Sequence, residues 1–141
     1  MPYRFLDEIA IADAAIEIES KDLKELFTDA AEALTLTMIS DLNSINKTKE
    51  IIIKIKAKDL ESLLFEFLEM LIYHKDADQL IFSDYSITIE EEECSLECVC
   101  LGEKIDYKKH DLSADVKAIT MHKFKLEKTD NGCNAFIILD I

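Results

Sequence analysis

The sequence is poor in the residues that break a chain or let it turn sharply. It has two glycines, one proline and no tryptophan among 141 residues. With glycine only at Gly102 and Gly132, a glycine-rich loop that cradles phosphate groups is excluded. The Gly-x-Ser-x-Gly turn of many hydrolases and the His-Glu-x-x-His helix of metalloproteases are absent too. Common signatures of nucleotide-binding and hydrolytic enzymes are therefore missing.

Basic residues and long apolar runs are scarce as well. Sixteen Lys and Arg stand against 30 Asp and Glu, which gives a formal net charge of −14. Because nucleic acids are held mainly by basic patches, tight direct binding of RNA or DNA is not expected. No uncharged run approaches the roughly 20 apolar residues of a membrane helix, and the first residues do not form a signal peptide. We therefore expect a cytoplasmic protein that meets a basic surface or a cation.

What the sequence does contain is an apolar fraction of 49%, which is enough for a core, and a length that predicts one domain over residues 1–141. Apolar residues at helical spacing predict two helices that begin after Asp22 and Asp59. Alternating residues predict strands at 3–6, 10–19, 50–57, 80–82, 85–89, 97–101, 116–125 and 135–139. This order predicts an α+β fold with two helices packed on one face of a mostly antiparallel β-sheet.

Four cysteines invite the question of a zinc site or a disulfide. Cys94, Cys98 and Cys100 share parity, so on a strand they would share one apolar face. Cysteines two residues apart on a strand chelate zinc poorly, and no export signal is present. We therefore expect buried, reduced core cysteines. Near Cys133, the pair Asn131-Gly132 predicts a tight hairpin turn.

The end of the sequence offers oxygen ligands. The apolar run 135–139 stops abruptly at Asp140 and Ile141, which places a carboxylate and the terminal oxygens on one rigid strand. Hard cations such as Ca²⁺ and Mg²⁺ require ligands of this kind. The alternative is a last strand whose penultimate residue is simply solvated.

Other residues offer less chemistry. His74 falls at a helix end, His110 in a polar loop and His122 on a predicted strand, and none has a nucleophile beside it in sequence. Lys117 interrupts an apolar strand, either as an outward-facing residue or as an anchor for carboxylates or a partner's phosphate. From these residues alone, an enzyme is not the expected function.

Four segments in the right order resemble the archease family over most of the chain, and one single residue fits the same pattern. Asp59 to Tyr73 looks like the family's second helix, and Leu80-Ile-Phe-Ser83 resembles the strand after it. Val116-Lys-Ala-Ile-Thr-Met-His122 is similar to the family's V-K-A-[IV]-T-x-H segment, and His110 lies the usual distance ahead of it. The sequence closes on Ile138-Leu-Asp-Ile141, as family members do.

The resemblance implies a small α+β accessory protein rather than an enzyme. Archeases promote guanylylation and multiple turnover of the GTP- and Mn²⁺-dependent tRNA-splicing RNA ligase of the RtcB type, so tRNA would be met only through the ligase. The family's metal site matches Asp13, Asp140 and Ile141 here, with Ca²⁺ the usual ion and Mn²⁺ or Mg²⁺ as alternatives. Lys117 and His122 match the family motif without an assigned role.

The match departs from the family at its first strand. Where the family reads H-T-A-D, this sequence reads Ala10-Ile-Ala-Asp13, so Asp7 or Glu8 is an alternative to Asp13 as the first ligand. Two other functions stay open. One is a general acidic interaction or chaperone module without ligase specificity. The other is a small metal-dependent hydrolase, for which only His122 or Glu8 could activate water.

Overall fold

The computed structural model describes residues 3–6 and 13–141, and Asp7 and Glu8 lie outside the described residues. Within these described residues, two helices and eight strands follow one another with a short 3-10 helix, η1. Their order is β1 (Tyr3–Leu6), β2 (Asp13–Ser20), α1 (Leu23–Met38), η1 (Leu42–Ser44), β3 (Lys49–Lys56), α2 (Leu60–Asp78), β4 (Leu80–Glu90), β5 (Ser95–Lys104), β6 (Ala118–Ile119), β7 (Lys125–Thr129) and β8 (Gly132–Asp140).

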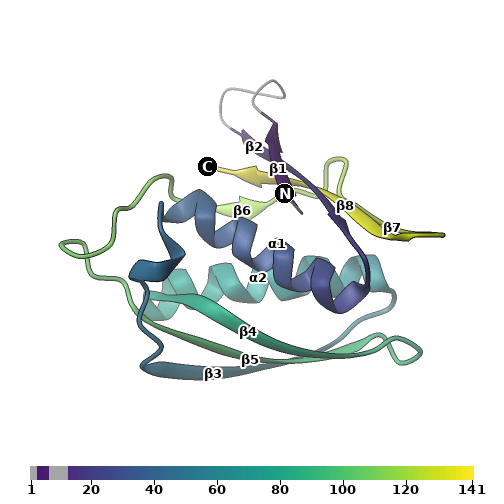
Figure 1. The fold of residues 1–141 in the computed structure, drawn as a ribbon, viewed down its shortest axis with the longest axis horizontal. Coiled ribbons are helices and arrows are strands. Elements are labelled where there is room, and N and C mark those ends of the chain that lie inside the picture. Colours follow the sequence, from purple (N-terminus) through teal and green to yellow (C-terminus); the bar gives the residue numbers. More distant parts are fainter. Residues whose placement is uncertain (1–2, 7–12) are drawn as a thin grey trace.

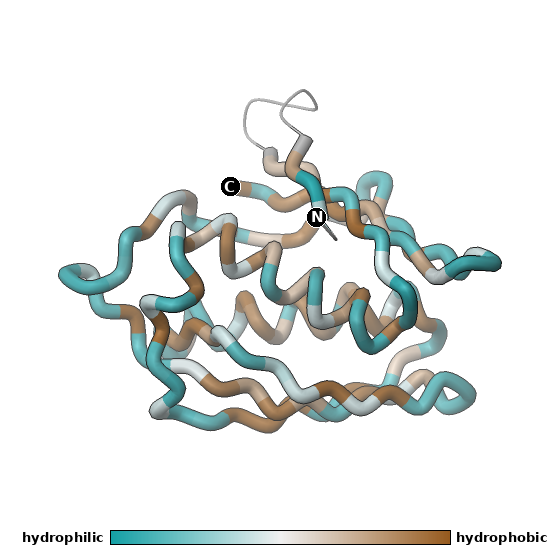
Figure 2. The backbone as a smooth tube through the Cα atoms, in the orientation of Figure 1, coloured by the Kyte–Doolittle hydropathy of each residue, from teal (hydrophilic) through white to brown (hydrophobic). Residues whose placement is uncertain are grey.

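The two helices lie between two antiparallel sheets (Figure 1). One sheet has the strand order β1-β2-β8-β6, with β7 also paired to β8, and the other has the order β3-β5-β4. The predicted α+β fold is therefore confirmed, and the structure adds that the helices cover one face of each of two sheets. Both helices contact both sheets. Figure 2 shows apolar residues along the helices and inner strands, with hydrophilic residues at the tips of the loops.

Both helix starts follow the capping signals in the sequence. The Asp22 carboxylate accepts a hydrogen bond from the Glu25 amide at 2.8 Å, and Asp59 accepts one from the Ser62 amide at 2.7 Å. Each bond satisfies an amide that the helix itself leaves without a partner. None of the helices within residues 3–6 and 13–141 is long and apolar enough to cross a membrane.

Strand β8 occupies the centre of its sheet. Strand β2 pairs with it along one side, and β6 and β7 pair with it in succession along the other. Three consecutive residues of β8 are buried, namely Ile137, Ile138 and Leu139, and of these Ile137 and Leu139 belong to the core cluster that includes the helices. The last strand of the sequence is thus the most enclosed part of this sheet.

The long strand predicted for 116–125 is wrong. Only Ala118–Ile119 and Lys125–Thr129 are strands there, and residues 122–123 form a turn in which Lys123 has φ 57°. A lysine in the left-handed region cannot continue a strand, so the chain leaves β8 and returns to it. The predicted strands 80–82 and 85–89 instead form one strand, β4, with an irregularity between Phe82 and Asp84.

The hairpin before β8 is confirmed, but its turn lies one residue earlier than predicted. Thr129 pairs with Gly132, so Asp130 and Asn131 form the turn. Gly132 is instead the first residue of β8, with φ 157°. A side chain there would lie only 2.3 Å from the Ser20 carbonyl oxygen, which explains the glycine.

All four cysteines are free, as predicted. Cys98 and Cys100 lie side by side in the core of β5, with their sulfur atoms 3.5 Å apart, and Cys133 is buried on β8. The prediction is wrong for Cys94, which lies in the β4–β5 turn with φ 50° and is only half-buried. Sequence parity cannot detect a turn that ends one residue before a strand begins.

Candidate functional site

Two of the predicted metal ligands meet at one end of the central strand. Asp13, the first residue of β2, is the direct register partner of Asp140, the last residue of β8. For Asp13 the structure describes the backbone, and the Asp140 side chain is partly buried. Strands of opposite direction thus bring together residues that are 127 positions apart in the sequence.

The other side of Asp140 is occupied by β6 and the residue before it. Ala118 pairs with Asp140, and the Lys117 amide donates to the Asp140 carbonyl oxygen at 2.8 Å. The same peptide group is held at its other end, because the Val116 carbonyl accepts a hydrogen bond from the Lys75 ammonium at 2.7 Å. A charged donor on the carbonyl polarises the peptide and strengthens its N–H as a donor. Lys75 on α2 is therefore linked through one peptide group to Asp140.

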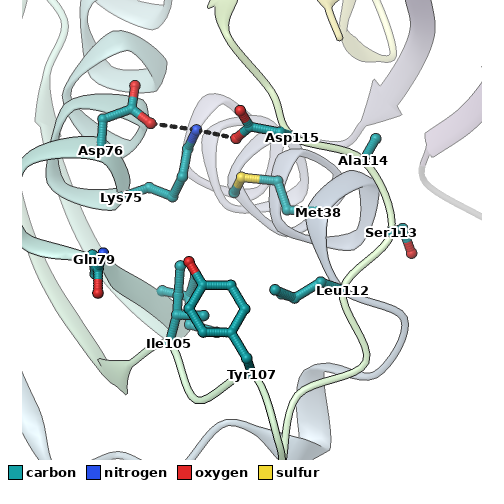
Figure 3. A pocket seen from close by; sticks show the side chains of 11 residues that line it. Met38, Lys75, Asp76, Gln79, Ile105, Tyr107, Leu112, Ser113, Ala114 and Asp115 are labelled. Atoms are coloured by element: carbon teal, nitrogen blue, oxygen red, sulfur yellow. Dashed lines mark hydrogen bonds and ion pairs between the residues drawn. The ribbon is translucent and has the colours of Figure 1, made fainter.

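Lys75 has a full set of acceptors. Its ammonium contacts the Asp76 carboxylate at 2.5 Å and the Asp115 carboxylate at 2.8 Å, in addition to Val116 (Figure 3). The side chain is only 8% exposed. Burial alone would lower the pKa of Lys75, but hydrogen bonds and charge from Asp115 and Asp76 outweigh burial and raise it. The ammonium therefore stays charged at neutral pH.

A pocket of about 350 Å³ opens beside this cluster, at the ends of α1 and α2. Figure 3 shows Lys75, Asp76 and Asp115 at one end of the pocket, with Tyr107 and Ile105 at the other. The remaining lining residues are Met38, Gln79, Ile81, Leu112, Ser113 and Ala114. The pocket therefore has a charged end and an apolar end, which is the usual character of a binding site of this volume.

A buried hydroxyl lies close to Asp140 along the sheet. The Thr120 amide donates to the Ile138 carbonyl oxygen at 3.0 Å, two residues before Asp140. The Thr120 hydroxyl oxygen is buried, and it has no hydrogen-bond partner in the part of the chain that the structure describes. An unsatisfied buried hydroxyl costs roughly 1–3 kcal/mol.

Known proteins that share this sequence pattern and fold belong to one family. The pattern that defines the Archease protein family matches residues 3–141. The chain belongs to the archease family. It is 39% identical to the protein archease of Pyrococcus furiosus over 123 residues, which are 86% of each chain. It is 32% identical to that of Archaeoglobus fulgidus over the full length of both.

Solved structures agree with the archease assignment. The solution structure of Methanobacterium thermoautotrophicum protein 1598 has a TM-score of 0.84 and 30% identity, and covers 99% of both chains. A crystal structure from Thermotoga maritima, described as an archease and possible chaperone, has a TM-score of 0.66 and 19% identity over 98% of both. At that identity the second structure supports the fold alone.

The remaining predicted residues of this archease lie at different distances from Asp140. Ile141 follows Asp140 directly and packs against the core while staying partly exposed. Lys117 is exposed, and its backbone amide is hydrogen-bonded to the Asp140 carbonyl oxygen. His122 lies in the exposed turn between β6 and β7 rather than on a strand, which corrects the sequence-based prediction. The structure thus brings Asp13, Asp140, Ile141 and Lys117 to one end of the sheet, and His122 lies further along it.

His110 is part of a hydrogen-bond network that stabilises a loop. The ring is buried, the Asp106 amide donates to its Nδ1 at 2.9 Å, and its Nε2 lies 3.0 Å from the Glu103 carboxylate. Because Nδ1 accepts, Nε2 carries the proton and donates to Glu103. Burial alone would raise the pKa of Glu103, but donors from Lys109, the Asn46 amide and His110 outweigh burial and lower it to about 2.

The donor set at Asp140 fits a hard cation in kind. It offers carboxylate and carbonyl oxygens rather than thiolate or imidazole, which suits Ca²⁺, Mg²⁺ or Mn²⁺. Within the residues whose side chains are described, no group of three or more His, Cys, Asp or Glu forms a metal cluster, and the Asp13 side chain is not among them. The metal role of Asp13, Asp140 and Ile141 therefore stays a prediction.

Lys75 and its pocket were missed by the sequence analysis, although a signal was present. Leu64, Leu68, Leu71 and Lys75 follow one another at spacings of four, three and four residues along α2. That spacing places the lysine on the buried stripe of the helix. A lysine at a core position requires acidic partners, and the short run Asp111 to Asp115 could have been searched for them.

Proposed function

We propose that this archease is a cytoplasmic accessory protein that activates a GTP- and Mn²⁺-dependent tRNA-splicing RNA ligase of the RtcB type. It promotes guanylylation of the ligase and multiple turnover in tRNA splicing. The observation that carries the proposal is the direct opposition of Asp13 and Asp140 at the end of the central strand. With a net charge of −14, the protein meets tRNA only through the ligase.

Asp13, Asp140 and Ile141 would hold a divalent cation, Ca²⁺ first and Mn²⁺ or Mg²⁺ as alternatives. Side chains of directly opposed residues in antiparallel strands are close enough to share a ligand. Two carboxylates at that spacing repel each other unless a cation or proton neutralises one of them. When bound, the cation supplies positive charge that can meet phosphate groups or the ligase's active site.

Lys117 adds a second positive charge to the same end of the sheet. Its backbone is fixed by the hydrogen bond to Asp140, while its side chain is exposed. An ammonium on a fixed backbone is suited to contact a phosphate of the ligase's nucleotide or RNA. We therefore assign Lys117 to the contact with the ligase complex and leave His122 without a role.

The alternative, a general chaperone module, is less well supported. Such a protein needs a contiguous exposed apolar surface. The exposed large apolar residues among those described are scattered over β1, β3, α2 and loops, and only Tyr107 and Leu112 line a common pocket. This distribution supports a specific complex rather than general capture of unfolded chains.

The test is multiple-turnover RNA ligation by the cognate ligase, with and without the archease. We expect strong stimulation by the wild type and its loss in Asp140→Ala. Asp130→Ala is the matched control, because Asp130 is an exposed carboxylate in the β7–β8 turn of the same sheet. Calorimetric titration with Ca²⁺ should detect binding by the wild type and Asp130→Ala only. Full stimulation by a folded Asp140→Ala protein would contradict the proposal.

A further inference from the structure

We propose that the pocket at the ends of α1 and α2 receives an arginine side chain of the protein partner. This inference rests on the proposed function in so far as that partner is the RNA ligase, while the pocket itself can be tested without the ligase. The charged end and the apolar end of the pocket match the two parts of an arginine side chain, which are a planar guanidinium and an apolar stem.

The charged end presents carboxylate oxygens that are already held in place. Lys75 binds one oxygen, Oδ1, of both Asp76 and Asp115. These side chains are 56% and 73% exposed, and in residues 3–6 and 13–141 neither carboxylate has another partner. A carboxylate that is fixed on one side loses little freedom when its second oxygen is bound. The second oxygen of each carboxylate is therefore available to an N–H donor of an incoming cation.

The apolar end presents a ring and an aliphatic side chain to solvent. Tyr107 is 70% exposed and Leu112 is 38% exposed, although both line the same pocket. Figure 3 shows the Tyr107 side chain at the end of the pocket away from Lys75. A guanidinium or its stem stacks on an exposed aromatic ring, and this favours arginine over lysine.

The charge balance favours a cation over an anion. The ammonium of Lys75 is matched by three acceptors and has no N–H left for an incoming phosphate or carboxylate. The two aspartates leave one net negative charge at the pocket, within a protein of net charge −14. A basic segment of a partner is therefore attracted both by the whole molecule and by this pocket.

A short stretch of backbone connects the pocket to the end of the sheet where Asp13 and Asp140 pair. Asp115 lines the pocket, and two residues later the Lys117 amide is bonded to Asp140. A partner whose arginine fills the pocket would thus also lie against the proposed metal site. The pocket would supply affinity for the ligase and would orient it, and the Asp13–Asp140 end would stimulate its guanylylation and turnover.

The direct test is a titration of the isotope-labelled archease with the peptide acetyl-Ala-Arg-Ala-amide, followed by NMR. We expect saturable shifts centred on the amides of Tyr107, Leu112 and Asp115. The citrulline peptide, which keeps the shape and lacks the charge, should bind roughly tenfold more weakly or not at all. Equal shifts with citrulline, or shifts spread evenly over the acidic surface, would overturn the proposal.

Two variants separate binding from folding. Tyr107→Ala removes an exposed ring and Asp115→Asn removes one carboxylate charge, and each should weaken arginine-peptide binding by about tenfold. Tyr73→Ala and Asp130→Asn are the matched controls, because both residues are exposed elsewhere and should leave binding unchanged. Unchanged binding in both pocket variants would sink the idea.

Ligation assays then connect the pocket to the partner. Tyr107→Ala should raise the archease concentration needed for half-maximal stimulation about tenfold without lowering the maximum. An unchanged concentration would show that the ligase does not use the pocket. If the wild type gives no stimulation at all, the proposed function fails, and the peptide titration still decides whether the pocket binds arginine.

Discussion

Two carboxylates in this archease are surrounded in opposite ways. Glu103 receives hydrogen bonds from Lys109, the Asn46 amide and His110, whereas no side-chain donor reaches the Asp140 carboxylate among the described residues. Glu103 belongs to a completed network that holds a loop against the end of β5. Asp140 stands opposite a second aspartate at a strand end. From this difference we predict that Glu103 stabilises the fold and that Asp140 binds a ligand.

The largest effect we expect is on the Asp140 side of this comparison. Ca²⁺ at about 100 times its Kd should raise the free energy of unfolding by about 2.7 kcal/mol, since only the folded chain joins Asp13 to Asp140. Urea unfolding with Ca²⁺ and with a chelator measures the difference. Ca²⁺ should not change the stability of Asp140→Ala. An equal gain in that variant would show that Asp140 does not bind the ion.

On the other side of the comparison, Glu103→Gln should lower the free energy of unfolding by about 2 kcal/mol. The substitution weakens hydrogen bonds from a charged lysine, a buried histidine and an amide at once. Urea unfolding at neutral pH gives the value. Glu97→Gln is the matched control, because Glu97 lies on the same strand with an exposed side chain and a 4.0 Å ion pair. A loss no greater than the control's would mean that the network contributes little.

Acid should remove the contribution of Glu103 in a defined window. Its pKa is about 2 in the folded state and near 4.5 without the network, so the folded state favours the ionised form. The stabilisation is therefore complete above about pH 5 and is lost as the pH falls from 4.5 towards 2. The stability difference between the wild type and Glu103→Gln, followed by urea unfolding against pH, should shrink across that window. A difference that stays constant down to pH 2 would contradict this assignment.

The smallest effect is the repulsion between the opposed aspartates. In a chelator, Asp140→Asn should raise the free energy of unfolding by about 0.5 kcal/mol, because like charges directly opposite in a sheet are destabilising. Thermal unfolding of both proteins without metal provides the measurement. Destabilisation by this substitution would show that the Asp140 carboxylate has a donor of its own, like Glu103.

Much of the fold was predictable because local chemistry decided it. Asp22 and Asp59 cap the two helices, and alternation located most strands. The division into two sheets was not predictable, since it depends on how the wide apolar surface of α2 is shared between layers. The positive φ of Lys123 and Cys94 broke predicted strand patterns for a reason that alternation does not encode.

The candidate site was predictable only in part. Asp140 stood out because charge follows an apolar run, and Asp13 came from the family resemblance. Their pairing required the register of β2 on β8. Lys75 and Tyr107 were not predicted from the sequence, because their roles depend on contacts between α2 and a distant loop.

The central position of β8 has a consequence for synthesis on the ribosome. Strand β2 is made early, but its partner β8 follows the other strands and both helices in the chain. Each nascent chain must keep β2 unpaired with β8 until that strand has emerged, while the β3-β5-β4 sheet can form earlier. An incomplete chain that lacks β8 cannot oppose Asp13 with Asp140. The proposed metal site therefore forms only after nearly all of the sequence has been translated.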